Sequence, residues 1–146
     1  MVQVANDPTT MANRLRPVLL RLARELRREI HSLGVTGGQV SLLVQIKKRP
    51  GITASELADL ERISAPGMSG HIVRLEAAGL IERTRAVDRR RIGLTVTDAG
   101  DKVLTTVRKR RTAWLTKRLQ ELDDASRDAL QAALPALEKL MEAQER

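Results

Sequence analysis

Arginine side chains are concentrated in one short stretch of this chain. Residues 82–91 carry a net charge of +3, because Glu82 and Asp88 are outnumbered by five arginines: Arg83, Arg85, Arg89, Arg90 and Arg91. Guanidinium groups form strong, often paired hydrogen bonds to phosphate oxygens. A plain solvated turn is the alternative reading, but it would not need so large an imbalance. The stretch therefore predicts a surface that binds a polyanion.

The last four residues of this stretch, Asp88–Arg91, are expected to form the turn of a β-hairpin between strands at 80–87 and 92–96. Asp88 lies two residues before Arg90, close enough to hold its guanidinium by a charge-assisted hydrogen bond, and Arg89 and Arg91 flank it. An arginine held at a hairpin tip suits the narrow minor groove of duplex DNA, whose negative potential attracts it.

A second group of candidate residues lies on a predicted helix that ends near residue 78. Ser64 is expected as its N-cap and Pro66 in its first turn. A helical wheel places Met68, Ile72 and Leu75 on one side, which should pack inward. The opposite side combines small residues with one guanidinium: Pro66, Gly67, Ser69, Gly70, Val73 and Arg74.

This small-residue face could approach the major groove closely. We expect Ser69 and backbone groups to contact phosphates and Arg74 to reach a phosphate or a guanine edge, while His71 borders the face. The alternative is an ordinary exposed helix face. The arginine-rich hairpin that follows in the chain favours contact with DNA.

The overall composition also favours duplex DNA as the partner. The chain has 146 residues, with Lys+Arg 26 against Asp+Glu 18 and a formal net charge of +8. Such an excess supplies sequence-independent affinity for phosphates through counterion release. Trp114 is the only aromatic residue of the Phe, Trp and Tyr class, and this disfavours single-stranded nucleic acids, whose bases stack on aromatic rings.

The sequence contains no catalytic constellation, and we expect neither an enzyme nor a cofactor. It has no glycine-rich phosphate loop and no serine-elbow motif. His31 and His71 are the only histidines and lie far apart, without carboxylates at metal-ligand spacing, so no metal site is expected. The absence of cysteine excludes disulfides, thiolate catalysis and cysteine zinc sites.

The chain also lacks the patterns that would direct it to a membrane. No stretch approaches the roughly 20 uncharged apolar residues of a membrane span. The N-terminal residues lack the basic-then-apolar order of a secretion signal. We therefore expect a cytoplasmic protein without a membrane partner.

Helix signals predict the elements that position these residues. Leucines recur at spacings of three and four over residues 11–32, where a first helix is expected. Thr36 with Gln39 and Thr53 with Glu56 have capping-box spacing and should open a second and a third helix. The third helix and the one after Ser64 form a helix-turn-helix. Thr97 should cap a long fifth helix over 98–122, with a sixth helix running to the C-terminus.

The basic run at 108–111 could contact DNA, but on a long amphipathic helix a solvated flank is the more common role.

The order of these elements resembles the MarR family of bacterial winged-helix regulators. Three stretches carry the resemblance in order and spacing: Leu75–Arg83, Asp88–Arg91 and Thr97–Gly100. It implies a mainly α fold with a small β-hairpin wing, in which residues 34–97 form a winged helix-turn-helix domain. Residues 8–33 and 98–146 would form a helical dimerisation domain.

The resemblance further implies a homodimeric, sequence-specific transcriptional regulator of double-stranded DNA, typically a repressor. Its operator would be an inverted repeat with half-sites about 10 bp apart. Release by a small phenolic or other aromatic anionic ligand is expected, in a site lined by the first, second and fifth helices. The sequence does not single out individual ligand-binding residues on these helices.

Two departures from the family pattern leave other functions open. Gly70 stands where relatives commonly carry a long basic side chain, and Val73 where a polar one is frequent. The recognition face therefore encodes little base readout, which keeps an architectural, weakly sequence-specific DNA-binding protein as the alternative. A helical adaptor that binds protein is a third hypothesis, and the arginine-rich hairpin argues against it.

Overall fold

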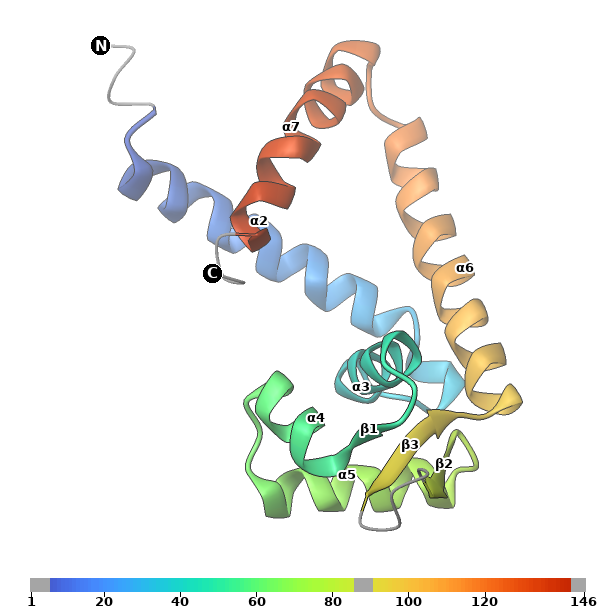
Figure 1. Cartoon of the computed structure of the whole chain (residues 1–146). Helices are drawn as coiled ribbons and strands as arrows, with labels where there is room; N and C mark the ends of the chain where they lie inside the picture. Colours follow the sequence, from blue (N-terminus) through green and yellow to red (C-terminus); the bar gives the residue numbers. More distant parts are fainter. Residues whose placement is uncertain (1–5, 86–90, 143–146) are drawn as a thin grey trace. The chain divides into compact units, whose positions relative to one another are not determined.

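A computed structural model describes residues 6–85 and 91–142 (Figure 1). The elements are α2 Pro8–Arg28, η1 His31–Leu33 (a 3-10 turn), α3 Gly37–Lys48, β1 Ile52–Thr53, α4 Ala54–Glu61, α5 Ala65–Ala77, β2 Ile81–Arg85, β3 Ile92–Val96, α6 Asp98–Gln120 and α7 Asp124–Glu142. The chain divides into two compact units, Met1–Arg111 and Thr112–Arg146. The mainly α fold with a small sheet is confirmed.

The capping signals read from the sequence form as predicted. Reciprocal capping boxes open α3, between Thr36 and Gln39, and α4, between Thr53 and Glu56. Each box satisfies backbone donors that a helix start would otherwise leave unpaired. The side chain of Thr97 accepts a hydrogen bond from the backbone of Gly100 at 3.1 Å, which caps α6.

The helix boundaries differ from the sequence prediction mainly at the N-terminal helix. α2 begins at Pro8 rather than near residue 11, because the carboxylate of Asp7 accepts a hydrogen bond from the backbone of Thr10. It ends at Arg28, and the separate turn η1 then leads to Gly34, whose φ of 75° is a left-handed conformation that glycine adopts without strain. Pro17 and Pro135 lie inside α2 and α7, and both helices continue through them.

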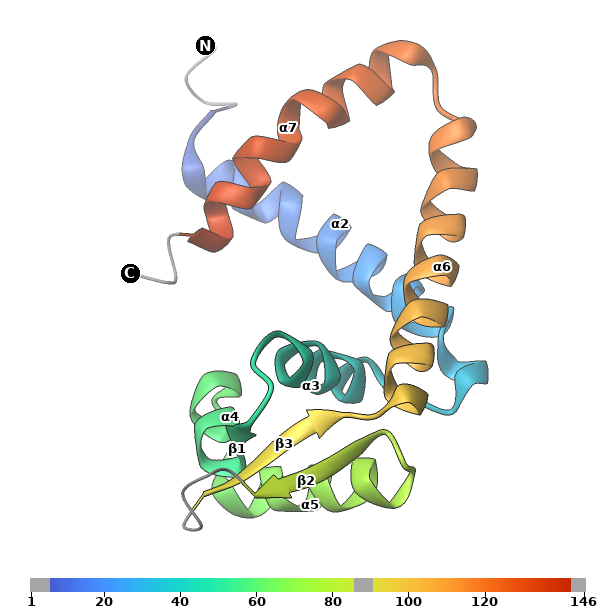
Figure 2. The ribbon, with the colours of Figure 1, turned by 45° about the vertical axis from the view of Figure 1, so that its right-hand side comes forward.

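The sheet has one strand more than the sequence predicted. Its antiparallel order is β1-β3-β2, with Ile52 opposite Leu94 and Ile81 opposite Val96. The two-residue β1 is too short to give a periodic signal. Leu80 was expected in a strand but instead closes α5, since its backbone N–H donates to the carbonyl of Leu75. Figure 2 shows α5 alongside β2 and α3 alongside β3.

The hydrophobic core lies in the first unit and is built from aliphatic side chains. The largest fully buried ones are Ile30, Leu43, Ile46, Leu57, Met68, Ile72, Leu75, Ile81 and Leu94. In contrast, neither α2 nor α7 contains a buried residue. Over residues 6–85 and 91–142, no helix combines the length and the apolar character that a membrane span requires.

Candidate nucleic-acid interface

The start of α5 is fixed by Ser64 and Gly67. The Ser64 hydroxyl accepts a hydrogen bond from the backbone N–H of Gly67 at 3.2 Å, and Pro66 lies in the first turn. A Cβ at Gly67 would lie 3.0 Å from that hydroxyl oxygen. Glycine at this position therefore keeps the cap compact, and Gly67 itself is only half-exposed.

The two sides of α5 are sorted as the helical wheel predicted. Met68, Ile72 and Leu75 are buried in the core. On the opposite side the exposed residues are Pro66, Ser69, Val73 and Arg74, with Gly70 and His71 half-buried among them. The predicted contact face is thus a real exposed surface of the first unit.

The guanidinium of Arg74 is held against its own helix. Its Nη2 lies 3.2 Å from Nδ1 of His71, and because arginine can only donate, the ring nitrogen accepts. An ideal Cβ on Gly70 would lie 3.7 Å from Nη1 of Arg74, so the guanidinium lies over the bare backbone of that residue. His71 and Gly70 together orient the one positive charge of this face.

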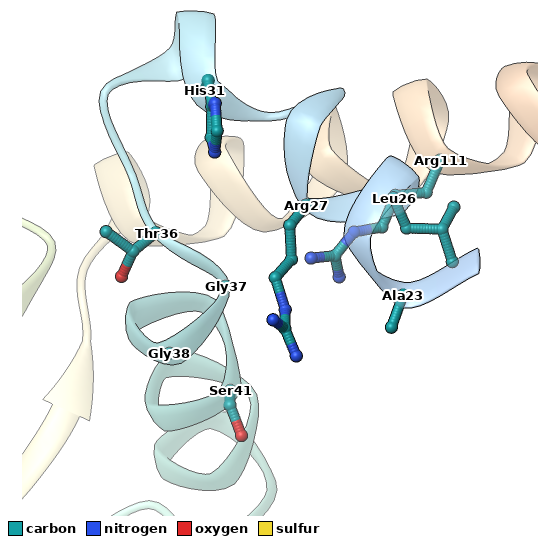
Figure 3. Close-up of a pocket in the computed structure, with 9 residues that line it drawn as sticks. All are labelled: Ala23, Leu26, Arg27, His31, Thr36, Gly37, Gly38, Ser41 and Arg111. Atoms are coloured by element: carbon teal, nitrogen blue, oxygen red, sulfur yellow. The ribbon is translucent and has the colours of Figure 1, made fainter. Parts of the chain in front are cut away.

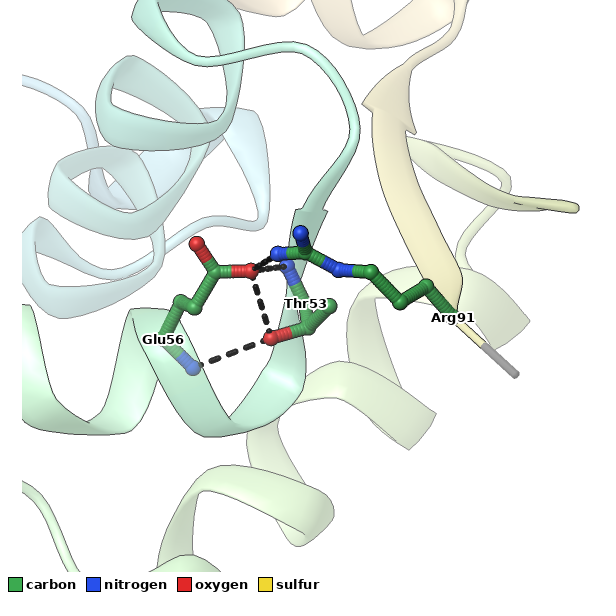
Figure 4. Close-up of polar contacts among 3 residues, drawn as sticks. All are labelled: Thr53, Glu56 and Arg91. Carbon is green, nitrogen blue, oxygen red and sulfur yellow. Dashed lines mark hydrogen bonds and ion pairs between the residues drawn. The ribbon is translucent and has the colours of Figure 1, made fainter. Parts of the chain in front are cut away.

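The hairpin carries arginines that are already paired. Nε of Arg83 on β2 lies 2.9 Å from a carboxylate oxygen of Glu76 on α5. Arg91, just before β3, pairs with Glu56 of α4 (Figure 4). The predicted contacts Asp88, Arg89 and Arg90 lie outside the described residues.

Glu56 also belongs to the candidate nucleic-acid interface, although the sequence predicts it only as the capping-box partner of Thr53. The hydroxyl of Thr53, and after it the Arg91 guanidinium, holds the pKa of Glu56 below its ordinary value of 4.5. The carboxylate is therefore ionised at neutral pH. Glu56 and Arg91 are 35 residues apart in the chain, and no local pattern links them.

A separate pocket of about 640 Å³ lies in the first unit, beside the start of α3 (Figure 3). Its lining comes from α2, η1, α3 and α6: Ala23, Leu26, Arg27, His31, Thr36, Gly37, Gly38, Ser41 and Arg111. None of these residues is acidic, and two are arginines whose side chains point toward the same space in Figure 3. The pocket therefore has a positive lining with two hydroxyl groups.

In the basic run at 108–111, Arg108, Lys109 and Arg110 are exposed, as expected of a solvated flank, whereas Arg111 lines the pocket. Arg110 donates a hydrogen bond to the hydroxyl of Ser32. Nε of Arg111 is buried and has no hydrogen-bond partner among the described residues. Among those residues there is also no group of three or more His, Cys, Asp or Glu side chains that could hold a metal ion.

The chain is similar in sequence to known transcriptional regulators. A family model described as "MarR family" matches residues 33–92. An uncharacterised HTH-type transcriptional regulator of Mycobacterium bovis is 31% identical over 124 residues, which span 84% of this chain and 87% of the relative. This chain belongs to the MarR family. As a member of the MarR family it is a DNA-binding transcriptional regulator and not an enzyme.

Further relatives agree with this placement of the MarR-family chain. The HTH-type transcriptional repressor MdtR of Bacillus subtilis is 31% identical over 120 residues, covering 82% of this chain and 76% of MdtR. A crystal structure from Pseudomonas aeruginosa, assigned as a transcriptional regulator, has a TM-score of 0.82 at 30% identity and covers 93% of this chain and 96% of its own. The MarR resemblance drawn from the sequence is confirmed.

Proposed function

We propose that this MarR-family protein is a homodimeric repressor that reads an inverted-repeat operator in duplex DNA. The observation that carries the proposal is the exposed face of α5, where small residues leave the helix backbone open to a groove and Arg74 is oriented over it. The proposed contacts are the N-cap Ser64 and, on α5, Pro66, Gly67, Ser69, Gly70, His71 and Arg74, together with Asp88, Arg89, Arg90 and Arg91 in the hairpin. MdtR, a relative of similar length, is named a transcriptional repressor.

The proposed homodimer rests on the apolar side chains that α2 and α7 leave exposed. Residues at helical spacing share one side of each helix: Leu19 and Leu22 on α2, 43% and 39% exposed, and Leu130 and Leu134 on α7, 47% and 53% exposed. Apolar residues gathered in this way mark a surface that another molecule covers. A second copy of the chain would bury them, with residues 8–33 and 98–146 as the dimerisation domain and 34–97 as the DNA-binding domain.

Two-fold symmetry of such a dimer determines the form of its operator. Two recognition helices related by a dyad read the same bases on opposite strands, so the site is an inverted repeat with half-sites about one turn of DNA apart. A regulator of this kind acts on chromosomal DNA, and we therefore place the protein in the cytoplasm.

Fluorescence anisotropy with competitor DNA tests this function. The labelled probe is a duplex carrying an inverted repeat selected by the protein from random-sequence DNA. We expect binding that survives an excess of unrelated duplex and weakens steeply with salt, because phosphate contacts release counterions. If any duplex competed equally well, the protein would instead have an architectural role. This role is the second candidate, because the small residues on the exposed face of α5 offer few side chains for base readout.

We also propose that a small aromatic anion releases the repressor from DNA by binding in the pocket beside α3. Arg27 and Arg111 bring two positive charges to a space without an acidic neighbour. The buried Nε of Arg111 is a donor that lacks a partner among the described residues, and leaving such a donor unpaired is unfavourable. The volume of about 640 Å³ lies within the range of small-molecule sites.

The pocket is suited to coupling because its lining joins helices of both proposed domains. Arg27 and Arg111 come from α2 and α6, whereas Gly37 and Ser41 come from α3. An anion between the arginines would draw them together and favour one spacing of α2 and α6 from α3. A ligand shifts such an equilibrium only as far as its affinity for the two arrangements differs.

Matched arginine variants test the release site. The probe ligand is 2-hydroxybenzoate, titrated into the operator complex. We expect Arg27→Gln and Arg111→Gln to bind operator but to need at least about tenfold more ligand for release, since each removes a charge-assisted hydrogen bond. Arg108→Gln, an exposed arginine of α6 outside the pocket, is the control and should respond normally. Unchanged release in both pocket variants would contradict this site.

A further inference from the structure

At the turn end of the hairpin, Arg91 joins the capping box of α4 to form a three-residue network. Oε1 of Glu56 accepts hydrogen bonds from the hydroxyl of Thr53 at 2.9 Å, from the backbone N–H of Thr53 at 3.4 Å and from Nη2 of Arg91 (Figure 4). The Thr53 hydroxyl oxygen in turn accepts from the backbone of Glu56 at 3.1 Å. The carboxylate that holds Arg91 is thus itself held at two points.

The support beneath this network is rigid. Thr53 belongs to β1 and lies opposite Gly93 of β3. A Cβ at Gly93 would lie only 2.7 Å from the backbone oxygen of Gly51, so the start of β3 is packed directly on the backbone that precedes β1. Glu56 and Arg91 therefore extend from neighbouring elements that have little freedom to move apart.

Stability of the fold does not account for the Glu56–Arg91 pair. The two side chains are 50% and 55% exposed, and ion pairs at such exposed positions contribute little to folding. Their effect is on the arginine itself. Among the described residues, Glu56 engages one of its five N–H donors, and a guanidinium can donate to a second acceptor at the same time.

We propose that Glu56 is a positioning residue for DNA binding: it holds the Arg91 guanidinium at the turn end of the hairpin so that its other N–H donors meet a DNA phosphate. A long side chain that is ordered before binding loses less entropy when the complex forms. In this arrangement the carboxylate of Glu56 orients the arginine for phosphate recognition, and the capped helix α4 supports the carboxylate. The inference rests on the proposed function, because it requires the wing to lie on DNA.

The sign of the Glu56 effect separates this role from simple electrostatics. A carboxylate close to DNA repels phosphate, so removal of its charge alone would strengthen binding. The same increase is expected if Arg91 has to leave Glu56 before it can reach DNA. Positioning predicts the opposite, namely weaker binding without the carboxylate, and only when Arg91 is present.

A double-mutant cycle on the full-length protein tests the inference. The variants are Glu56→Gln, Arg91→Gln and both together, with anisotropy titration of the selected inverted-repeat duplex as the measurement. Glutamine can retain the capping box, so α4 should stay folded, and circular dichroism with a thermal melt checks this. Asp59→Asn, an exposed carboxylate on the same helix, is the matched control for loss of one negative charge.

We expect Glu56→Gln to weaken operator binding by about two- to tenfold in the Arg91 background and to have no effect in the Arg91→Gln background. Asp59→Asn should bind as the parent does or slightly tighter. Equal or tighter binding by Glu56→Gln, or the same loss in both backgrounds, would overturn the inference while leaving the proposed function intact. Failure of the parent protein to retain any duplex against competitor would instead overturn the proposed function and this inference with it.

Discussion

The helices of this protein differ in whether their apolar side chains are buried or exposed. α5 has 13 residues and buries Met68, Ile72 and Leu75, whereas α2 and α7 have 21 and 19 residues and bury none. The first kind is completed by contacts within its own unit. The second kind presents leucine and valine to solvent, which a second copy of the chain would remove. The difference supports the proposal that the terminal helices pack against a second copy of the chain, whereas α5 is stabilised by contacts within its own unit.

The largest expected effect comes from placing a charge on each kind of helix. Leu75→Asp should destabilise the first unit by more than about 4 kcal/mol, because it buries an unpaired carboxylate at a fully buried position. Leu134→Asp lies on α7 at a side chain that is 53% exposed. It should leave the melt of the first unit nearly unchanged and dissociate the proposed dimer.

Thermal denaturation and analytical ultracentrifugation of the two variants measure these outcomes. If Leu134→Asp stayed as associated as the parent, the exposed apolar face of α7 would not be an interface. If Leu75→Asp melted like the parent, the assignment of a self-sufficient core to the first unit would be wrong.

Alanine substitutions at two glycines, one packed against backbone and one open, should have opposite effects on stability. A Cβ at Gly100 would lie 2.3 Å from the carbonyl oxygen of Leu80, so Gly100→Ala should destabilise the fold by about 1–3 kcal/mol as the backbone shifts. At Gly70 the nearest atom is a mobile guanidinium nitrogen at 3.7 Å. Gly70→Ala should therefore stabilise α5 by up to about 1 kcal/mol. Chemical denaturation measures both, and equal effects at the two positions would contradict the packing described.

The exposed face of α5 predicts an effect on DNA rather than on folding. Arg74→Ala should weaken operator binding by about 1–3 kcal/mol and reduce the salt dependence by about one phosphate contact, with the melt and the dimer unchanged. Anisotropy titrations over a salt series measure both quantities. Unchanged affinity would show that this face does not contact DNA.

The smallest effect is on stability in acid. The Thr53 hydroxyl, more than Arg91, lowers the pKa of Glu56 from 4.5, and the Ser126 hydroxyl lowers that of Asp123 from 3.8. A pKa lowered by folding means that the stabilisation is present above the unfolded value and is lost as pH falls through the folded one. The thermal midpoint of unfolding should therefore decrease at pH values below about 4.5. Glu56→Gln and Asp123→Asn should each flatten this slope slightly, and parallel curves for parent and variants would contradict the assignment.

The sequence predicted the parts of this fold that depend on neighbouring residues. The capping pairs Thr36 with Gln39 and Thr53 with Glu56 are three residues apart, and both form in the structure. The inward side of α5 follows from helical periodicity and is confirmed. The sequence does not predict strand β1 or the start of α2, because a two-residue strand has no period and a single aspartate cap is a weak signal.

The parts that depend on distant residues could not be predicted. Glu56 was recognised as a cap, but its pairing with Arg91 needs β1 and β3 to lie side by side. The pocket likewise brings Arg27 and Arg111 together from helices far apart in the chain. Asp88, Arg89 and Arg90 remain sequence predictions, as they lie outside the described residues.

The stoichiometry of the operator complex tests the central claim most directly. Analytical ultracentrifugation of a labelled duplex with one inverted repeat, in an excess of unrelated DNA, counts the chains bound to it. A homodimer on an inverted repeat should place two chains on each duplex, and both should be lost together when one half-site is scrambled. One chain per duplex, or loading that grows with DNA length regardless of sequence, would contradict a homodimer that reads an inverted repeat.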